Sequence, residues 1–239
     1  MFRVPSLWLA LTLGGLSTSF ADVDCSSSGF HWSDQLDYGS SEQMKYEVKE
    51  IPPYGRVLVA SGDIASRESV RLRSALRRAR HVDEVWLISS GGISQEGIKM
   101  GKVLRAFKAT VRIPRGAGCA SACSVAFLGG AFRTVEQGAG YGVHFWGARP
   151  NKDLGRSIAN AIRAGDEGDD AIIGAEIAKI LTDTQSRNAA YRTSVRTQYL
   201  QEMGISLRWL EEWSSTRNKC MNWLSQRKMK SMLVTNFDE

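Results

Sequence analysis

Histidine and cysteine are scarce in this chain of 239 residues, which has three histidines and four cysteines. His31, His81 and His144 form no cluster with carboxylates at the spacing of a helical metal site. The cysteines do not follow a zinc-binding spacing either, because no histidine pairs with them. We therefore expect no metal and no other cofactor, so catalysis would depend on the protein's own side chains and amides.

Long apolar runs are also missing. The stretch from Leu7 to Leu16 is too short to span a bilayer comfortably. It follows a positive start at Arg3 and precedes small residues at Ser19 and Ala21, which is the pattern of a cleaved signal peptide. We expect residues 1–21 to be removed, which leaves a periplasmic or secreted protein without stable membrane insertion. An uncleaved anchor is the alternative.

The net charge of +6 owes much to one arginine run. Such a run could attract nucleic acid or an anionic membrane. The simpler interpretation is the solvated face of a helix, and we expect no nucleic-acid partner. The arginines are Arg71, Arg73, Arg77, Arg78 and Arg80.

The even number of cysteines favours disulfides in an exported chain. Cys119 and Cys123 are four residues apart, which is too far for a relaxed bridge in mid-helix but not at a helix entry. Cys25 with Cys220 is a further pairing, and it would tie the N-terminal segment to the C-terminal one. The spacing does not choose among these pairings. It differs from Cys-x-x-Cys, which argues against a thiol–disulfide oxidoreductase.

Short apolar segments alternate with helical patterns, which predicts an α/β fold with parallel crossover connections. We expect a loop-rich segment over residues 22–50 and one domain over 51–235, with an exposed insertion at 147–170 and no internal repeats. Ser66 and Ser94 are the expected caps of two helices, the first over 67–79 with Leu72, Ala75, Leu76 and Ala79 inward. Strands are expected at 56–60, 84–88, 109–113 and 141–146, and further helices near Ser121, through 173–181 and at 207–213.

Ser121 lies in a segment of small residues at the expected start of a buried helix. A helix N-terminus stabilises negative charge, and the amide of Ala122 would face the oxygen of an attacked carbonyl. Gly92, in the turn Ser89-Ser90-Gly91-Gly92, could supply a second amide. His144 ends an apolar strand and could accept the serine proton. Together these residues predict acyl transfer by a serine nucleophile.

These motifs resemble the proteolytic subunit of Clp protease, within the ClpP/crotonase fold. Ser89–Gly92 matches the family's oxyanion turn with Ser90 in place of proline, Ala120-Ser121-Ala122 matches the nucleophile segment, and Val143-His144 matches the base. The Cys-Ala-Ser-Ala-Cys and Gly-Val-His-Phe forms are similar to an exported branch of ClpP-like bacterial proteins. The resemblance implies repeated ββα-type crossover units with a helical C-terminal part, a peptide or unfolded-protein substrate, and a homo-oligomer.

The position of the third catalytic residue departs from the family. There, the acid precedes a run similar to Trp223-Leu224-Ser225, but residues 215–222 contain no carboxylate here. We therefore prefer a Ser–His dyad, oriented by Thr216 or by a backbone carbonyl. Asp169, Asp170 and Asp183 lie nearer to His144 in sequence but match no family position.

Two further hypotheses compete with a peptidase. The missing acid favours a ClpP-like binding protein of the periplasm that has weak activity or none. A crotonase-type acyl-CoA enzyme would use the same paired amides, but coenzyme A is cytoplasmic and the signal peptide argues against it.

Overall fold

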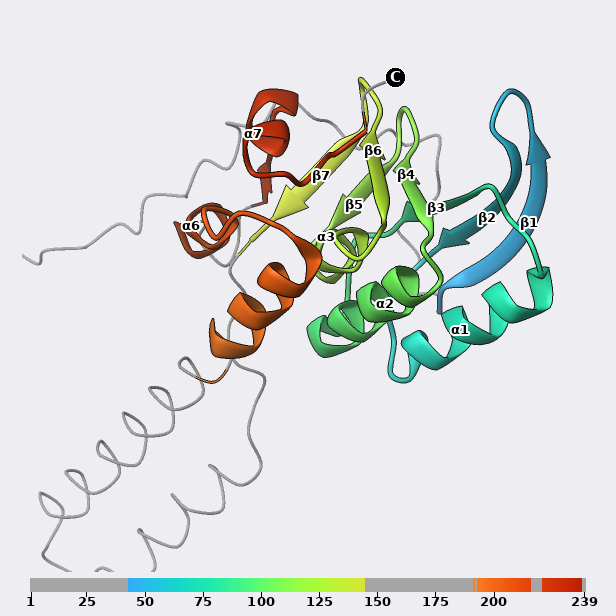
Figure 1. Ribbon diagram of the computed structural model, residues 1–239, viewed down its shortest axis with the longest axis horizontal. Coiled ribbons are helices and arrows are strands. Elements are labelled where there is room, and N and C mark those ends of the chain that lie inside the picture. Colours follow the sequence, from blue (N-terminus) through green and yellow to red (C-terminus); the bar gives the residue numbers. More distant parts are fainter. Residues whose placement is uncertain (1–42, 145–190, 192, 216–220, 238–239) are drawn as a thin grey trace, which may run out of the picture.

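The computed structural model describes residues 43–144, 191, 193–215 and 221–237 (Figure 1). They form a five-stranded sheet of order β1-β2-β3-β4-β6 and a three-stranded sheet of order β5-β7-β8. The elements are β1 Lys45–Ile51, β2 Gly55–Ser61, α1 Glu68–Ala79, β3 Glu84–Ile88, α2 Ser94–Ala106, β4 Thr110–Ile113, β5 Gly118–Ala120, α3 Ala122–Phe127, β6 Phe132–Val135, β7 Gly140–Val143, α6 Trp209–Ser215, β8 Asn222–Trp223 and α7 Gln226–Ser231. A helix also covers 193–203.

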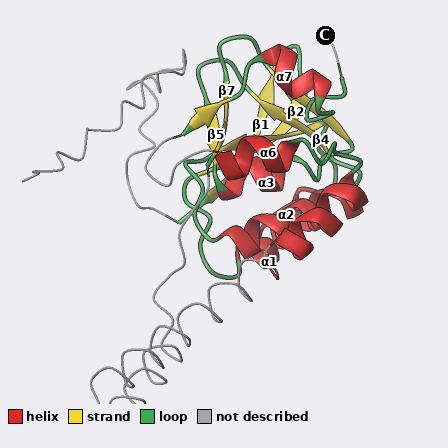
Figure 2. Cartoon of the chain, turned by 90° about the vertical axis from the view of Figure 1, so that its left-hand side faces the viewer, coloured by secondary structure: helices red, strands yellow, loops and turns green. Residues whose placement is uncertain are grey.

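The larger sheet is built from crossover units, as the sequence predicted. Strands β2, β3, β4 and β6 run parallel, and α1 and α2 connect the first three of them along one side of the sheet (Figures 1 and 2). Leu58 pairs with Val85, and Val85 pairs with Val111, so three buried side chains form a row across the sheet. This row belongs to the core that the two helices cover. The α/β class is confirmed.

Helix α1 has the apolar stripe predicted for it, since Leu72, Ala75, Leu76 and Ala79 are all buried. The cap was predicted wrongly. Arg67 occupies the N-cap position in the left-handed conformation, and no side chain caps the helix. The arginine run does face solvent as predicted, since Arg73, Arg77, Arg78 and Arg80 are exposed and Arg71 is half-buried.

The start of the domain was also predicted wrongly. Strand β1 pairs antiparallel with β2 from Lys45 to Ile51, so part of the expected loop-rich segment 22–50 belongs to the sheet. The reason is that β1 is an edge strand. Five of its seven residues are exposed, so its sequence lacks the apolar run that marks the inner strands.

The smaller sheet adjoins the larger one where β3 ends. Ser89, the residue after β3, forms a parallel bridge with Cys119 in β5, and β5 pairs parallel with β7. Strand β8 then pairs antiparallel with β7, so residues 222–223 lie beside residues 142–143. The end of β3, the whole of β5 and the end of β7 are therefore neighbours, although they are far apart in sequence.

The C-terminal end is fixed to the larger sheet by Arg133 in β6. Its guanidinium is buried and donates to the carbonyl oxygens of Gly130 at 2.7 Å, Val234 at 2.8 Å and Leu233 at 2.9 Å. Burial lowers the pKa of Arg133 to about 10. It remains a cation at neutral pH, and these carbonyls take the place of water around it.

Several predictions lie outside the described residues. They are the signal peptide at 1–21, the insertion at 147–170, the helix through 173–181 and the last residues of the strand at 141–146, which is described to Val143. Across the described part of the chain, no helix is both long and apolar enough to span a membrane.

Candidate active site

Ser121 lies at the sharp turn between β5 and α3. Its backbone has φ 57° and ψ −118°, a conformation that a residue with a side chain adopts at a cost. Its amide donates to the carbonyl of Gly142 at 3.0 Å, and the hydroxyl of Ser124 donates to its carbonyl at 2.7 Å. The turn is held by the sheet on one side and by the helix on the other.

His144 follows β7 and reaches Ser121 directly. The Nε2 atom of His144 lies 2.8 Å from Oγ of Ser121, which is hydrogen-bond distance. Both side chains are half-buried, so the pair is open to solvent on one side. The parallel pairing of β5 with β7 explains the encounter, because it brings the residues that follow the two strands to the same edge.

The glycine turn after β3 packs against the serine. The buried hydroxyl of Ser89 accepts the amide of Gly91 at 3.0 Å. The next amide, that of Gly92, finds no hydrogen-bond acceptor among the described residues, and Gly92 is exposed. Ala122 is the first residue of α3, so its amide has no partner within the helix. Among the described residues, neither of the two predicted oxyanion amides has a hydrogen-bond acceptor.

The two glycines have different neighbours from those that the sequence suggested. A Cβ on Gly91 would lie 2.6 Å from Cβ of Ser121 and 3.0 Å from the amide nitrogen of Ala122. A Cβ on Gly92 would instead overlap the backbone of Ile64, 2.9 Å from its carbonyl carbon. Alanine at Gly92 would therefore disturb the backbone at Ile64, whereas Gly91 is the glycine that faces Ser121.

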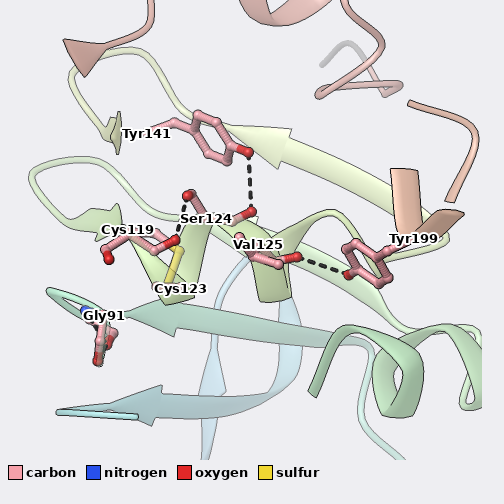
Figure 3. Close-up of a disulfide and its surroundings, with 9 residues drawn as sticks. Gly91, Cys119, Cys123, Ser124, Val125, Tyr141 and Tyr199 are labelled. Carbon is pink, nitrogen blue, oxygen red and sulfur yellow. Dashed lines mark hydrogen bonds between the residues drawn. A yellow bond between two sulfur atoms is a disulfide. The ribbon is translucent and has the colours of Figure 1, made fainter. Parts of the chain in front are cut away.

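A disulfide brackets the serine. Cys119 in β5 is bonded to Cys123 in α3, with their Cα atoms 5.2 Å apart, and both side chains are fully buried (Figure 3). The sequence left this pairing open. The bridge forms because Cys119 belongs to a strand and Cys123 to the first turn of a helix, so the pair is not in mid-helix.

The other end of α3 is held by two tyrosines that the sequence analysis did not single out. The hydroxyl of Tyr141 donates to the carbonyl of Ser124 at 3.1 Å, and that of Tyr199 donates to the carbonyl of Val125 at 2.9 Å (Figure 3). The indole of Trp209 donates to the Tyr141 hydroxyl at 2.9 Å. Burial raises the pKa of both tyrosines, so both hydroxyls remain protonated donors.

These contacts satisfy carbonyls that a helix of six residues leaves without partners. In the sequence, these contacts are indicated only by the presence of aromatic residues and of a helix made of small residues. Such a pattern is too common to predict which tyrosine bonds to which carbonyl. Helix α3 is therefore fixed at one end by a disulfide and at the other by hydroxyls from distant parts of the chain.

Three predicted site residues lie outside the described residues, namely Thr216, Cys25 and Cys220, as do Asp169, Asp170 and Asp183. Within the described ranges, no group of three or more histidine, cysteine or carboxylate side chains is arranged to hold a metal ion.

No protein-family model and no curated protein matches the chain. Among solved structures it is similar to a mutant of ClpP1 from Listeria monocytogenes, at 13% identity and a TM-score of 0.41, over 75% of this chain and 88% of that one. It is also similar to a mutant of the 1510-N membrane-bound stomatin-specific protease, at 18% identity and a TM-score of 0.30. That match covers 43% of this chain and 57% of the length of the other. The function must therefore be argued from the residues of the site.

Proposed function

We propose that this chain is an exported serine hydrolase that cleaves peptide bonds in peptides or unfolded protein. Ser121 is the nucleophile and His144 is its base. The observation that carries the proposal is the 2.8 Å approach of His144 Nε2 to Ser121 Oγ at the entry of α3. A serine and a histidine at this distance are the minimal parts of an activated hydroxyl. The peptide substrate and the homo-oligomer are proposed from the resemblance to Clp protease.

The reaction proceeds in two halves. Oγ of Ser121 attacks the substrate carbonyl carbon while Nε2 of His144 takes the hydroxyl proton. The amides of Gly92 and Ala122 stabilise the negative oxygen of the tetrahedral intermediate. The C–N bond then breaks, and the leaving amine takes the proton from His144. Water, activated by the same histidine, hydrolyses the acyl-serine and restores the hydroxyl.

The test is covalent labelling by a fluorophosphonate, which reacts with an activated serine. The wild-type protein should bind one probe molecule per chain, and Ser121→Ala should bind none. Labelling of His144→Ala should be almost as low, because residues that act as one unit have non-additive effects. Ser231→Ala is the matched control, since Ser231 is exposed on α7 and its hydroxyl donates to the carbonyl of Lys228 in the same helix. A wild-type protein that folds but neither labels nor hydrolyses peptides would favour a binding protein.

The orientation of His144 is tested with the same probe. In the dyad that we propose, replacing Asp169, Asp170 or Asp183 with Asn should cost little, because none of these residues matches the family's acid position. Thr216→Val should reduce labelling if this hydroxyl orients the imidazole. An Asp→Asn change that costs as much as His144→Ala would establish a triad and refute the dyad.

A further inference from the structure

The Cys119–Cys123 disulfide encloses the proposed nucleophile in a covalent ring of five residues, with Ser121 at its middle. Neither sulfur can touch a substrate, because both side chains are fully buried. We propose that this disulfide is a positioning device that holds Ser121 in the conformation from which it reacts. The inference rests on the proposed hydrolase function and deepens it.

The first argument is the distance that the bond imposes. A chain of this length, fully extended, would separate its end Cα atoms by about 13 Å. The disulfide holds the Cα atoms of Cys119 and Cys123 at 5.2 Å, which a bridge requires. The chain must therefore reverse within the ring, and the reversal falls on Ser121, the residue with φ 57°.

The second argument is that the backbone hydrogen bonds of helix α3 add little to hold this turn. The hydrogen bond from the amide of Val125 to the carbonyl of Ser121 is long, at 3.4 Å. Helix α3 has only six residues, so it has little cooperativity of its own to hold its first turn. A serine in this region of φ and ψ relaxes unless its surroundings prevent it. The covalent ring prevents that relaxation.

The third argument is that the same bond ties the oxyanion turn to the nucleophile. The backbone of Ser89 accepts from Ala120 at 2.9 Å and donates to Gly118 at 3.0 Å, on either side of Cys119. Ser89 also orients the Gly91 amide. A shift of Cys119 would therefore move the glycine turn and the serine relative to each other. Misplacement by about 1 Å can lower a reaction rate by about a hundredfold.

The test compares wild type with Cys119→Ala/Cys123→Ala by fluorophosphonate labelling, measured below the melting temperature of both proteins. We expect the maximal labelling rate to fall about a hundredfold. The probe's half-saturating concentration should change little, since the bridge touches no ligand. The control for lost stability is Tyr46→Phe, which removes a hydrogen bond from Tyr46 to Glu68. This control should label at the wild-type rate.

Reduction of the wild type gives a second, reversible arm. Dithiothreitol can reach the buried disulfide only when the structure opens locally, so thiol counting must first show that two cysteine thiols have formed while dithiothreitol was oxidised to its cyclic disulfide. Labelling should fall as in the double variant and recover on reoxidation with oxidised glutathione. Labelling of the double variant should be the same with and without dithiothreitol. This control shows that reduction of Cys25 or Cys220 does not cause the change seen in the wild type. This arm also decides the question if the double variant does not fold.

A crystal structure of the double variant or of the reduced protein completes the test. We expect Ser121 to leave positive φ and its Oγ to move beyond hydrogen-bond distance of His144. Retention of both, or an unchanged labelling rate beside an active wild type, overturns the positioning role and leaves the hydrolase standing. A wild type that never labels refutes the hydrolase itself, while the φ of Ser121 without the bridge still shows whether the bond sets the turn.

Discussion

Gly91→Ala and Gly92→Ala should differ in their main effect, the first on the reaction and the second on stability. The two glycines are adjacent, and both have positive φ, at 114° and 136°. Gly91→Ala should act mainly on the reaction. Its Cβ would lie 2.6 Å from Cβ of Ser121. Carbon atoms in contact are normally about 3.5–4.0 Å apart, so the serine turn must move by about 1 Å. We expect labelling of Ser121 to slow by about a hundredfold.

Gly92→Ala should act mainly on the fold. Its Cβ would overlap the carbonyl of Ile64, which accepts from Ile93 at 2.8 Å, beside the bond from Ile64 to the Gly91 carbonyl at 2.7 Å. Two backbone hydrogen bonds at about 1 kcal/mol each and backbone strain of about 1–3 kcal/mol give a loss of about 3–5 kcal/mol. The free energy of unfolding of a folded domain is about 5–15 kcal/mol in total, so we expect Gly92→Ala to be only marginally stable.

Thermal unfolding and fluorophosphonate labelling, measured on the same samples, separate the two effects. We expect Gly91→Ala to lose about 1–3 kcal/mol through backbone strain and some further stability because its Cβ would lie 2.7 Å from the carbonyl oxygen of Ala120. Each kcal/mol lowers the melting temperature by about 2–4 °C. Gly92→Ala should fall further in stability. The reasoning fails if Gly91→Ala is folded and labels at the wild-type rate, or if Gly92→Ala proves the more stable of the two.

Three other predictions concern stability. Tyr199→Phe should cost about 1–3 kcal/mol in urea unfolding, because it leaves the buried carbonyl of Val125 without a donor; an unchanged midpoint would mean that this carbonyl finds another partner. Glu84→Gln should cost about 1–3 kcal/mol, because it weakens two charge-assisted hydrogen bonds of the buried Arg112, which keeps Glu136 as a second carboxylate partner; a neutral effect would contradict the pairing. Burial acts to raise the pKa of Glu96, but hydrogen bonds from Lys99 and Ser69 outweigh it and hold that pKa below its ordinary value. Its charge therefore stabilises the fold above the unfolded pKa, near 4.3, and this stabilisation is lost as pH falls through the folded pKa. Glu96→Gln should be less stable than wild type at pH 7, and equally stable well below the folded pKa; a gap that persists in acid would refute the assignment.

The sequence predicted the inner strands well because burial determines their composition. The continuous apolar run at residues 84–88 matches β3 residue for residue. The two edge strands of the larger sheet, β1 and β6, and the short strands β5 and β8 were missed. Such strands are stabilised by neighbours that are distant in sequence, so their own amino-acid composition does not identify them as strands.

The helix caps were mispredicted for a related reason. Ser94 was expected to cap α2, but it is the first residue of the helix, and its hydroxyl accepts a hydrogen bond from Arg196 at 2.7 Å. The partner is 102 residues away, beyond the reach of a local capping rule.

For the candidate site, the sequence predicted which residues approach one another but not what holds them in place. The approach of Ser121 and His144 follows from two parallel strands, β5 and β7, which end at the same edge. The sequence does not reveal the strain at Ser121, nor which glycine faces it. Both depend on how turns from β3 and β5 pack, and that packing is a property of the whole sheet.

The contacts that anchor α3 determine at what stage of synthesis and folding the site can be complete. A chain synthesised only as far as residue 144 already contains the serine, the histidine and both glycines. It still lacks Tyr199 and Trp209, and it lacks β8, which pairs with β7 next to His144. Because chains emerge N-terminus first, these contacts can form only after residues 199–223 have been synthesised. The hydrolase that we propose would therefore complete its site late, with the C-terminal part of its own chain.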